Sequence, residues 1–298
     1  TPWRGPRHGA SSRSDSVASF LSVYLSEQAV AIITFLSDFG SRSPYPAAMK
    51  AVASGISKAT LLDISHDVRR HDIREGAYLL FAVAPSFPAG TVHVAVVDPG
   101  VGTARAGLMV KAGGQFFVGP DNGLLLPAAH RLGSITVYRI QNPAYLRPNV
   151  SPTFHGRDVF APVGAHLARG VPPEEIGERV EAYVDLDFGR GCWEEGGLTG
   201  RVIYIDPFGN LVTNIPGEMV QGVWEYGDVI AVEAGGRSIE APFAPSYGFV
   251  PPGQFLVAIG SDGFLEVAIN QGDAAGKLGV AIDEGIRFGG IPLARETL

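Results

Sequence analysis

Two short segments carry the densest set of side chains that can do chemistry. In residues 98–105 (Asp-Pro-Gly-Val-Gly-Thr-Ala-Arg), the proline and the two glycines favour a tight turn. Such a turn can fold back so that the Asp98 carboxylate and the Arg105 guanidinium form a bidentate pair. A pair of this kind either braces the turn or holds a reactant, and these eight residues alone leave both interpretations open.

The second segment is residues 153–158 (Thr-Phe-His-Gly-Arg-Asp), followed by an apolar stretch with helical spacing over 159–167. Asp158 is suited to cap that helix, whose first N–H groups would then point toward the neighbourhood of His155. A lone histidine is more often structural than catalytic. The Gly, Arg and Asp beside this one, at a helix start, shift the balance modestly toward a functional role.

The elements that must position these side chains alternate between strand and helix patterns. They are strands over 29–36, 60–64 and 90–97, helices over 46–57 and 72–83 with Asp72 as N-cap, and a hairpin of 108–110 with 115–118. This alternation predicts an α/β domain with a largely parallel sheet. Ligands bind outside the carboxyl ends of strands in open α/β sheets. We therefore expect Asp38, Asp98 and Asp121, which follow strands, at the rim of one crevice.

The pattern changes after a stretch rich in Gly and acidic residues over 181–197. Short strands separated by Gly and Pro turns then predict a smaller, barrel-like all-β domain. The predicted division is an N-terminal extension over 1–28, an α/β domain over 29–190 and a β domain over 191–298.

The predicted β domain carries further polar segments. In residues 206–210 (Asp-Pro-Phe-Gly-Asn), Phe208 can stack on a base and Asn210 can read a purine edge. Taken alone, however, the segment favours a β-turn with local side-chain hydrogen bonds. Ser261 follows Gly260 in a loop whose backbone can approach a ligand closely, and Glu266 on the next strand suits a solvated face.

Composition narrows the classes of function. The net charge of -7 is spread without a basic cluster, which argues against nucleic acid as a partner. Cys192 is the single cysteine, so no internal disulfide or thiolate metal cluster is possible, and a reducing cytoplasm is compatible. No apolar run is long enough to cross a membrane, residues 1–28 lack a clean signal peptide, and no spacing indicates a metal site.

Six blocks in order resemble the SAM hydroxide adenosyltransferases (the DUF62 family), relatives of the fluorinase and chlorinase enzymes. They are Leu-Ser-Asp-Phe-Gly at 36–40, Asp-Ile-Ser-His at 63–66, Val-Asp-Pro-Gly-Val-Gly-Thr at 97–103, Gly-Pro-Asp-Asn-Gly at 119–123, Thr-Phe-His-Gly-Arg-Asp at 153–158 and Asp-Pro-Phe-Gly-Asn at 206–210. The resemblance covers residue 29 to the C-terminus. It implies hydrolysis of S-adenosyl-L-methionine (SAM) to adenosine and methionine, with no cofactor, in a homotrimer that binds SAM between subunits.

The resemblance also implies roles for individual residues. Asp98, Arg105 and His155 correspond to a catalytic triad that holds the attacking water, and Asp38 to an aspartate that binds the ribose hydroxyls. The substrate contacts that it implies from the second domain are Asp206, Asn210 and Ser261. The ring of Phe208 is expected to join them because of its residue type alone. Read without the resemblance, the block at 63–66 favours a structural role over a catalytic one.

Three alternatives remain at this point. A halogenase is disfavoured, because Gly156 stands where the fluorinase has a halide-binding serine and the triad is intact. A metal-dependent phosphoesterase would use Asp38, Asp98, Asp121, Asn122 and His155 around two metals. A non-catalytic sensor would bind SAM or adenosine without turnover. Which member of the triad accepts the proton also stays open.

Overall fold

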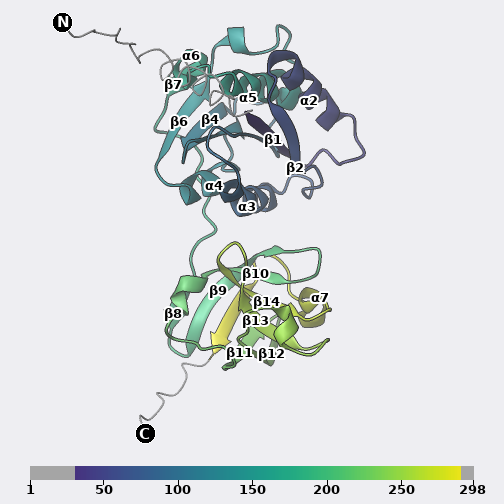
Figure 1. Cartoon of the computed structure of the whole chain (residues 1–298), viewed down its shortest axis with the longest axis vertical. Helices are drawn as coiled ribbons and strands as arrows, with labels where there is room; N and C mark the ends of the chain where they lie inside the picture. Colours follow the sequence, from purple (N-terminus) through teal and green to yellow (C-terminus); the bar gives the residue numbers. More distant parts are fainter. Residues whose placement is uncertain (1–30, 290–298) are drawn as a thin grey trace, which may run out of the picture.

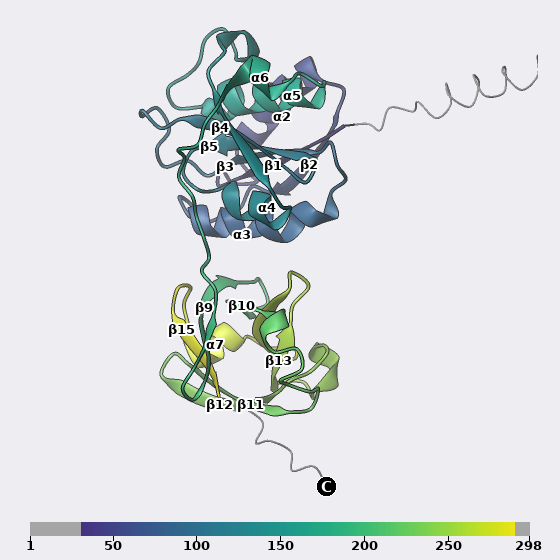
Figure 2. The same cartoon turned by 90° about the vertical axis from the view of Figure 1, so that its left-hand side faces the viewer.

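The computed structural model describes residues 31–289, which form two domains joined along one side by an extended segment (Figures 1 and 2). The predicted extension over 1–28 lies outside the described residues. Within the part described, no helix is long and apolar enough to cross a membrane.

A seven-stranded sheet forms the centre of the first domain, in the order β2-β1-β3-β5-β4-β6-β7. Its strands are β1 (Ile32–Ser37), β2 (Thr60–Ser65), β3 (Val92–Val96), β4 (Gly107–Ala112), β5 (Gln115–Pro120), β6 (Ile135–Ile140) and β7 (Gly177–Arg179). Pairing is parallel from β2 to β5 and antiparallel from β5 to β7. The sheet is thus mixed rather than largely parallel. The Gly113–Gly114 turn, with both φ values positive, folds β4 back beside β5, and β6 and β7 continue that antiparallel edge.

Helices cover both faces of this sheet (Figure 1). They are α2 (Tyr45–Ile56), α3 (Ile73–Val83), α4 (Leu126–Arg131), α5 (Ala161–Ala168) and α6 (Pro173–Ile176). Helix α2 packs beside α5, and α3 packs beside α4. Asp72 caps α3 as predicted, because its side chain accepts a hydrogen bond from the Glu75 N–H.

The predicted helix over 159–167 begins differently. A π-helical turn, Gly156–Phe160, follows His155 and continues into α5. The prediction that Asp158 caps the helix is wrong. Its side chain is fully buried inside the π-turn and accepts hydrogen bonds from Arg147, Arg157 and the Ser151 N–H instead.

The second domain is an all-β sheet that curls into a nearly closed barrel, with the order β12-β11-β15-β9-β10-β14-β13 and β8 beside β9. Its elements are β8 (Cys192–Glu194), β9 (Gly197–Ile205), β10 (Leu211–Pro216), β11 (Val229–Ala234), β12 (Arg237–Pro242), β13 (Phe255–Ile259), β14 (Phe264–Ile269), α7 (Ala274–Leu278) and β15 (Gly285–Gly289). A bridge between Phe243, just after β12, and Val257 of β13 brings the two outer strands together.

Aromatic stacking joins the two domains where α3 faces the barrel (Figure 1). The Tyr78 ring stacks on Tyr204 at 4.4 Å between centroids, and Phe81 stacks on Phe264 at 5.4 Å. The Tyr78 hydroxyl also donates to the Asp262 carboxylate over 2.5 Å. This interface combines apolar contact with directional hydrogen bonding, which fixes how the domains meet.

A buried polar chain under α3 gives the first testable prediction. Thr34 donates to Nδ1 of His93 over 2.7 Å, and Nε2 of His93 donates to Gln115 over 2.7 Å, since the Gln115 amide N–H groups already donate to the carbonyls of Ala84 and Phe87. Burial lowers the pKa of His93 to about 4, although its hydrogen bond to Gln115 opposes the shift. The unfolded chain binds a proton near pH 6.5 and the folded chain does not, so stability is complete above pH 6.5 and falls toward pH 4.

This linkage corresponds to a loss of about 3 kcal/mol in the free energy of unfolding between pH 6.5 and pH 4. Urea unfolding at pH 7, 6 and 5 should show a shallower pH dependence in His93→Gln than in the unchanged chain. His130→Gln, at an exposed histidine of α4, is the control and should keep the full slope. Equal slopes in all three proteins would contradict the prediction.

Candidate active site

Asp98, Arg105 and His155 meet at the carboxyl end of β3. Arg105 donates to both oxygens of Asp98, through Nε over 2.9 Å and through Nη2. The second hydrogen of Nη2 points to Nδ1 of His155, 2.7 Å away. The Asp98 and Arg105 side chains are only 4% and 12% exposed. The predicted pair is therefore formed, and one guanidinium nitrogen connects it to the imidazole.

This geometry determines the proton on the imidazole. A guanidinium only donates, so Nδ1 of His155 must accept and the proton of the neutral ring lies on Nε2. Burial lowers the pKa of His155, and the charge of Arg105 lowers it further, while Asp98 and Asp158 oppose the shift. The ring is consequently neutral at pH 7.

A glycine shapes the loop that carries the pair. Gly102 has φ +77, and a Cβ there would lie 2.4 Å from the carbonyl oxygen of Pro152, in the segment that leads to His155. The loop over 98–105 therefore packs directly on the loop of the histidine, and only glycine permits that approach.

Gly102→Ala should consequently damage both the fold and the site. Gly90→Ala is the matched control, because Gly90 has φ +87 and open space around its Cβ position. Both variants carry the cost of a left-handed alanine, about 1 kcal/mol. Only Gly102→Ala adds the clash with Pro152, so we expect it to lose clearly more stability in urea unfolding and to lose turnover as well. Equal losses would contradict this packing argument.

Two members of the triad, Asp98 and His155, line a pocket of about 330 Å³, a volume typical of small-molecule sites. Asp38, Asp98 and His155 line it together with Arg70, His71, Val96, Val101, Thr153, Gly156 and three aromatic rings. Those rings, Phe39, Tyr45 and Phe154, contact one another edge to face at centroid distances of 5.2–5.8 Å. The pocket thus combines carboxylates with an aromatic wall beside the triad.

None of these three rings was among the predicted site residues. Phe39 follows Asp38 directly and Phe154 precedes His155, so adjacency to the chosen residues was the available signal. Tyr45 opens α2, and nothing in its local pattern distinguishes it. Asp38 itself is held by the backbone of His71, whose N–H donates to its carboxylate over 2.9 Å.

The residues predicted from the second domain lie elsewhere. Asp206 and Ser261 line a separate pocket of about 390 Å³ that shares no lining residue with the triad pocket. Asn210 is buried and donates to Asp206 over 2.9 Å, whereas 76% of Phe208 is exposed. Within one chain, these side chains and the triad therefore belong to two sites.

Glu266 also lines this second pocket, and the prediction made for its exposure is wrong. It is not a solvated face residue, because only 7% of it is exposed and it accepts a hydrogen bond from the Tyr247 hydroxyl over 2.7 Å. Burial raises the pKa of Glu266, with Tyr247 opposing and the neighbouring Asp262 and Asp206 adding to the rise.

The predicted crevice of three aspartates forms only in part. Asp121 does not line the triad pocket, and its carboxylate accepts from the Val184 N–H. Asn122 donates to the Val97 carbonyl, which secures the end of β3. In residues 31–289, no group of three or more His, Cys, Asp or Glu side chains converges in a way that would hold a metal ion. The side chains expected around two metals are therefore not assembled.

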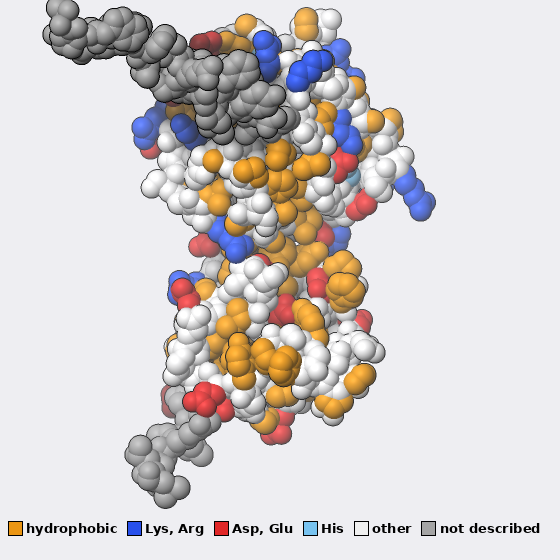
Figure 3. Space-filling model, in the orientation of Figure 1, with side chains coloured by type: hydrophobic (Ala, Val, Ile, Leu, Met, Phe, Trp, Pro, Cys, Tyr) orange, Lys and Arg blue, Asp and Glu red, His pale blue; other side chains and the backbone are white. Residues whose placement is uncertain are grey.

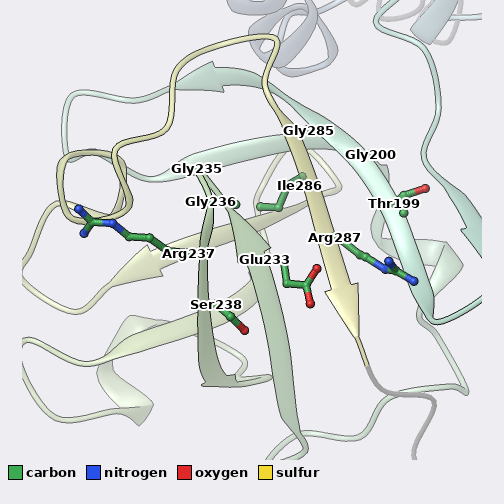
Figure 4. A pocket seen from close by; sticks show the side chains of 11 residues that line it. Thr199, Gly200, Glu233, Gly235, Gly236, Arg237, Ser238, Gly285, Ile286 and Arg287 are labelled. Atoms are coloured by element: carbon green, nitrogen blue, oxygen red, sulfur yellow. The ribbon is translucent and has the colours of Figure 1, made fainter.

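A larger hollow, about 540 Å³, opens on the barrel surface between β9, β11, β12 and β15 (Figure 4). Its two arginines extend in different directions (Figure 4). Arg237 donates to the Lys277 carbonyl, and Arg287 to the Glu195 carbonyl. The guanidinium groups thus bind backbone, and this hollow has no counterpart to the Asp–Arg–His arrangement.

Comparison with known proteins confirms the family resemblance that the order of the six sequence blocks indicated. Residues 33–177 match the SAM hydroxide adenosyltransferase N-terminal domain and residues 200–287 match the C-terminal domain. The chain belongs to this family. It is 41% identical to a protein of Thermus thermophilus named (R)-S-adenosyl-L-methionine hydrolase, over 83% of this chain and 95% of that protein.

Two further matches show how similar this SAM hydroxide adenosyltransferase family member is to a solved structure and to a fluorinase. A solved structure of an uncharacterized conserved protein from Thermotoga maritima superposes with a TM-score of 0.82 at 38% identity, covering 86% of this chain and 99% of that chain. The fluorinase of Nocardia brasiliensis is more distant, with 30% identity over 82% of this chain and 92% of that enzyme.

Proposed function

We propose that the chain hydrolyses SAM to adenosine and L-methionine, by attack of a water or hydroxide held at Arg105 and His155 on the ribose C5′. The observation that carries the proposal is the Nη2 atom of Arg105, which binds Asp98 and His155 at once beside the pocket. The names of the relatives support SAM as the substrate, and the contact between Arg105 and His155 supports the proposed way of holding the attacker.

The proton on Nε2 of His155 determines how the proposed site would stabilise the attacking oxygen. Nε2 of His155 is a donor, and the Arg105 guanidinium, whose Nη2 hydrogens point to Asp98 and His155, adds positive charge behind it. A water oxygen at Nε2 is therefore favoured as hydroxide. Asp98 anchors Arg105 and orients it. In this arrangement the triad lowers the pKa of the bound water, and the water's proton leaves to solvent rather than to Nδ1, which Arg105 already occupies.

The leaving group needs little assistance from the protein. Carbon–sulfur cleavage releases methionine as a neutral thioether, so no general acid has to protonate it. Alignment of the oxygen with the C5′–S bond is the main requirement, and such positioning can contribute about 7–11 kcal/mol in favourable systems. In the proposal Asp38 binds the ribose hydroxyls, and metal ions and cofactors take no part.

We further propose a homotrimer in which the triad pocket of one subunit meets the second-domain pocket of another. The supporting observation is that the two pockets are separate within one chain. Phe208, Tyr226 and Phe249 are 76%, 64% and 71% exposed on the second domain, whose surface shows apolar side chains in Figure 3. The substrate contacts from the neighbouring subunit would then be Asp206, Phe208, Asn210 and Ser261.

We also propose a cytoplasmic location, with which the single exposed cysteine is compatible.

A 5′-halogenase is the second candidate, favoured only by the more distant fluorinase match. Gly156 opposes it, because a Cβ at this position would lie 3.1 Å from the Met49 sulfur and 3.3 Å from the Phe39 ring. A serine at this position would require both neighbours to move by a few tenths of an ångström.

Product analysis tests the proposal. SAM enriched in either sulfonium epimer is incubated with the protein, with EDTA present or absent and with chloride or fluoride present or absent. Adenosine and methionine in equal amounts, unaffected by EDTA or halide and faster from the (R) epimer, are the expected result. A 5′-halogenated nucleoside would establish the halogenase, activity lost on chelation would establish metal dependence, and nucleoside binding without product would establish a sensor.

A further inference from the structure

A buried histidine outside the triad, His66, ties the loop of Asp38 to the neighbouring strand. It follows β2 and is only 6% exposed. Its Nδ1 lies 2.7 Å from the Ser37 hydroxyl, at the end of β1, and its Nε2 lies 3.0 Å from the Asp63 carboxylate. Its carbonyl also accepts from the Gly40 N–H over 2.7 Å. Two of these contacts bracket Asp38 along the chain.

The hydrogens in this chain follow from the partners. Asp63 accepts from the Lys50 ammonium over 2.7 Å; burial alone would raise the pKa of Asp63, but the hydrogen bonds and charges of Lys50 and His66 hold it below its usual value. The carboxylate therefore accepts from Nε2–H of His66. Nδ1 is then an acceptor for the Ser37 hydroxyl, whose oxygen receives the Phe39 N–H over 3.3 Å.

Ser, His and Asp in contact resemble a nucleophilic triad, but the burial excludes that role. Ser37 is fully buried and does not line the pocket, so no substrate reaches its oxygen. The chain of contacts instead ends on the backbone N–H of Phe39, the residue after Asp38. It fixes the path of the loop and, with it, the direction of the Asp38 carboxylate.

We propose that His66 is a positioning residue, which holds the Asp38 loop through Ser37 and thereby sets the affinity for the nucleoside. This inference rests on the proposed function, in which Asp38 binds the ribose. Nδ1 is the atom that matters for binding, because it faces Ser37. Nε2 faces Asp63, which also accepts from Lys50, and serves to hold the ring in place.

Two substitutions separate these atoms. In His66→Asn the amide reaches about as far as Nδ1, so it keeps the contact to Ser37 and loses that to Asp63. In His66→Gln the amide reaches about as far as Nε2, so it keeps Asp63 and loses Ser37. Each variant gives up one hydrogen bond of the same buried ring, which makes their stability losses comparable.

The experiment measures KM and kcat for SAM, and the dissociation constant of adenosine by calorimetry, in both variants and in Ser37→Ala. We expect His66→Gln and Ser37→Ala to raise KM and the adenosine constant about tenfold, the equivalent of one lost hydrogen bond, with kcat nearly unchanged. His66→Asn should bind like the unchanged chain. The double variant Ser37→Ala/His66→Gln should be no worse than either single change, because both remove the same contact.

Two results would overturn the inference. One is equal weakening of adenosine binding in the Asn and Gln variants, since a merely structural histidine would not distinguish Nδ1 from Nε2. The other is a loss of kcat at unchanged KM. Adenosine binding is measured without turnover, so failure of the unchanged chain to hydrolyse SAM would refute the proposed function separately from this inference.

Discussion

His155→Ala is expected to lower kcat for SAM hydrolysis by about 10²–10³-fold, the usual cost of removing one hydrogen-bond donor to a developing anion. The substitution removes the Nε2 donor, and it leaves a hydrogen of the Arg105 Nη2 atom without its acceptor. Arg105 remains paired with Asp98, so the pocket keeps its charge. Adenosine should therefore bind with nearly unchanged affinity. His130→Ala, at an exposed histidine of α4, controls for the general effect of removing an imidazole.

The pH dependence of kcat/KM tests the same role of His155. Protonation of His155 would place a hydrogen on Nδ1, against the guanidinium, so only the neutral ring is active. Because the pKa of His155 is lowered, the acid limb of kcat/KM should lie below pH 6.5. The charge of Asp98 opposes this lowering, so Asp98→Asn should move the acid limb to still lower pH while reducing the rate. An acid limb above pH 6.5, or turnover unaffected by His155→Ala, would refute the assignment.

Asp158→Asn is expected to cost about 3 kcal/mol in the free energy of unfolding, the lower end of the range for breaking a buried ion pair. The Asp158 side chain is fully buried and receives hydrogen bonds from Arg147, Arg157 and the Ser151 N–H. An amide NH₂ in place of one carboxylate oxygen would point a donor at these donors. Arg147 and Arg157 are 43% and 31% exposed, so they can turn toward water, which keeps the cost at the lower end.

Urea unfolding of Asp158→Asn beside Asp121→Asn measures this cost. Asp121 accepts one backbone hydrogen bond from Val184, and the amide oxygen of its Asn variant can still accept it, so this variant should lose less than about 1 kcal/mol. Burial alone would raise the pKa of Asp158, but Arg157, the Ser151 N–H and Arg147 hold it below its usual range. Its contribution is therefore complete above the ordinary carboxyl pKa near 4 and is lost in more acidic solution. Similar losses in the free energy of unfolding of the two variants would show that Asp158 does not hold the segment behind His155 in place.

Local pattern was sufficient for much of the first domain. The helices over 46–57 and 72–83, the cap at Asp72 and the 108–118 hairpin appear where their spacing and turn residues predicted them. These features depend on neighbours within a few residues in the chain, which a single sequence displays. The turn residues over 98–105 likewise predicted the Asp98–Arg105 pair.

The partners of individual polar side chains were harder to predict. Asp158 has the residue type and position of a cap, yet its partners are Arg147 and Ser151, contributed by a loop whose path local pattern does not show. Asp121 follows a strand as Asp38 and Asp98 do. It turns away from the pocket because β5 lies on the other side of β3 from β1, which only the strand order reveals.

By itself the sequence determined the two-domain plan, the residue types of the site and, through the order of its blocks, the family. Only the tertiary structure decided that Nη2 of Arg105 reaches His155 across 50 residues of chain, that Ser37, His66 and Asp63 are connected, and that Asp206 and Ser261 line a different pocket from the triad. The physical reason is the same in each case. A hydrogen bond depends on the separation and direction of two atoms in space, and those are set by how the strands and loops pack.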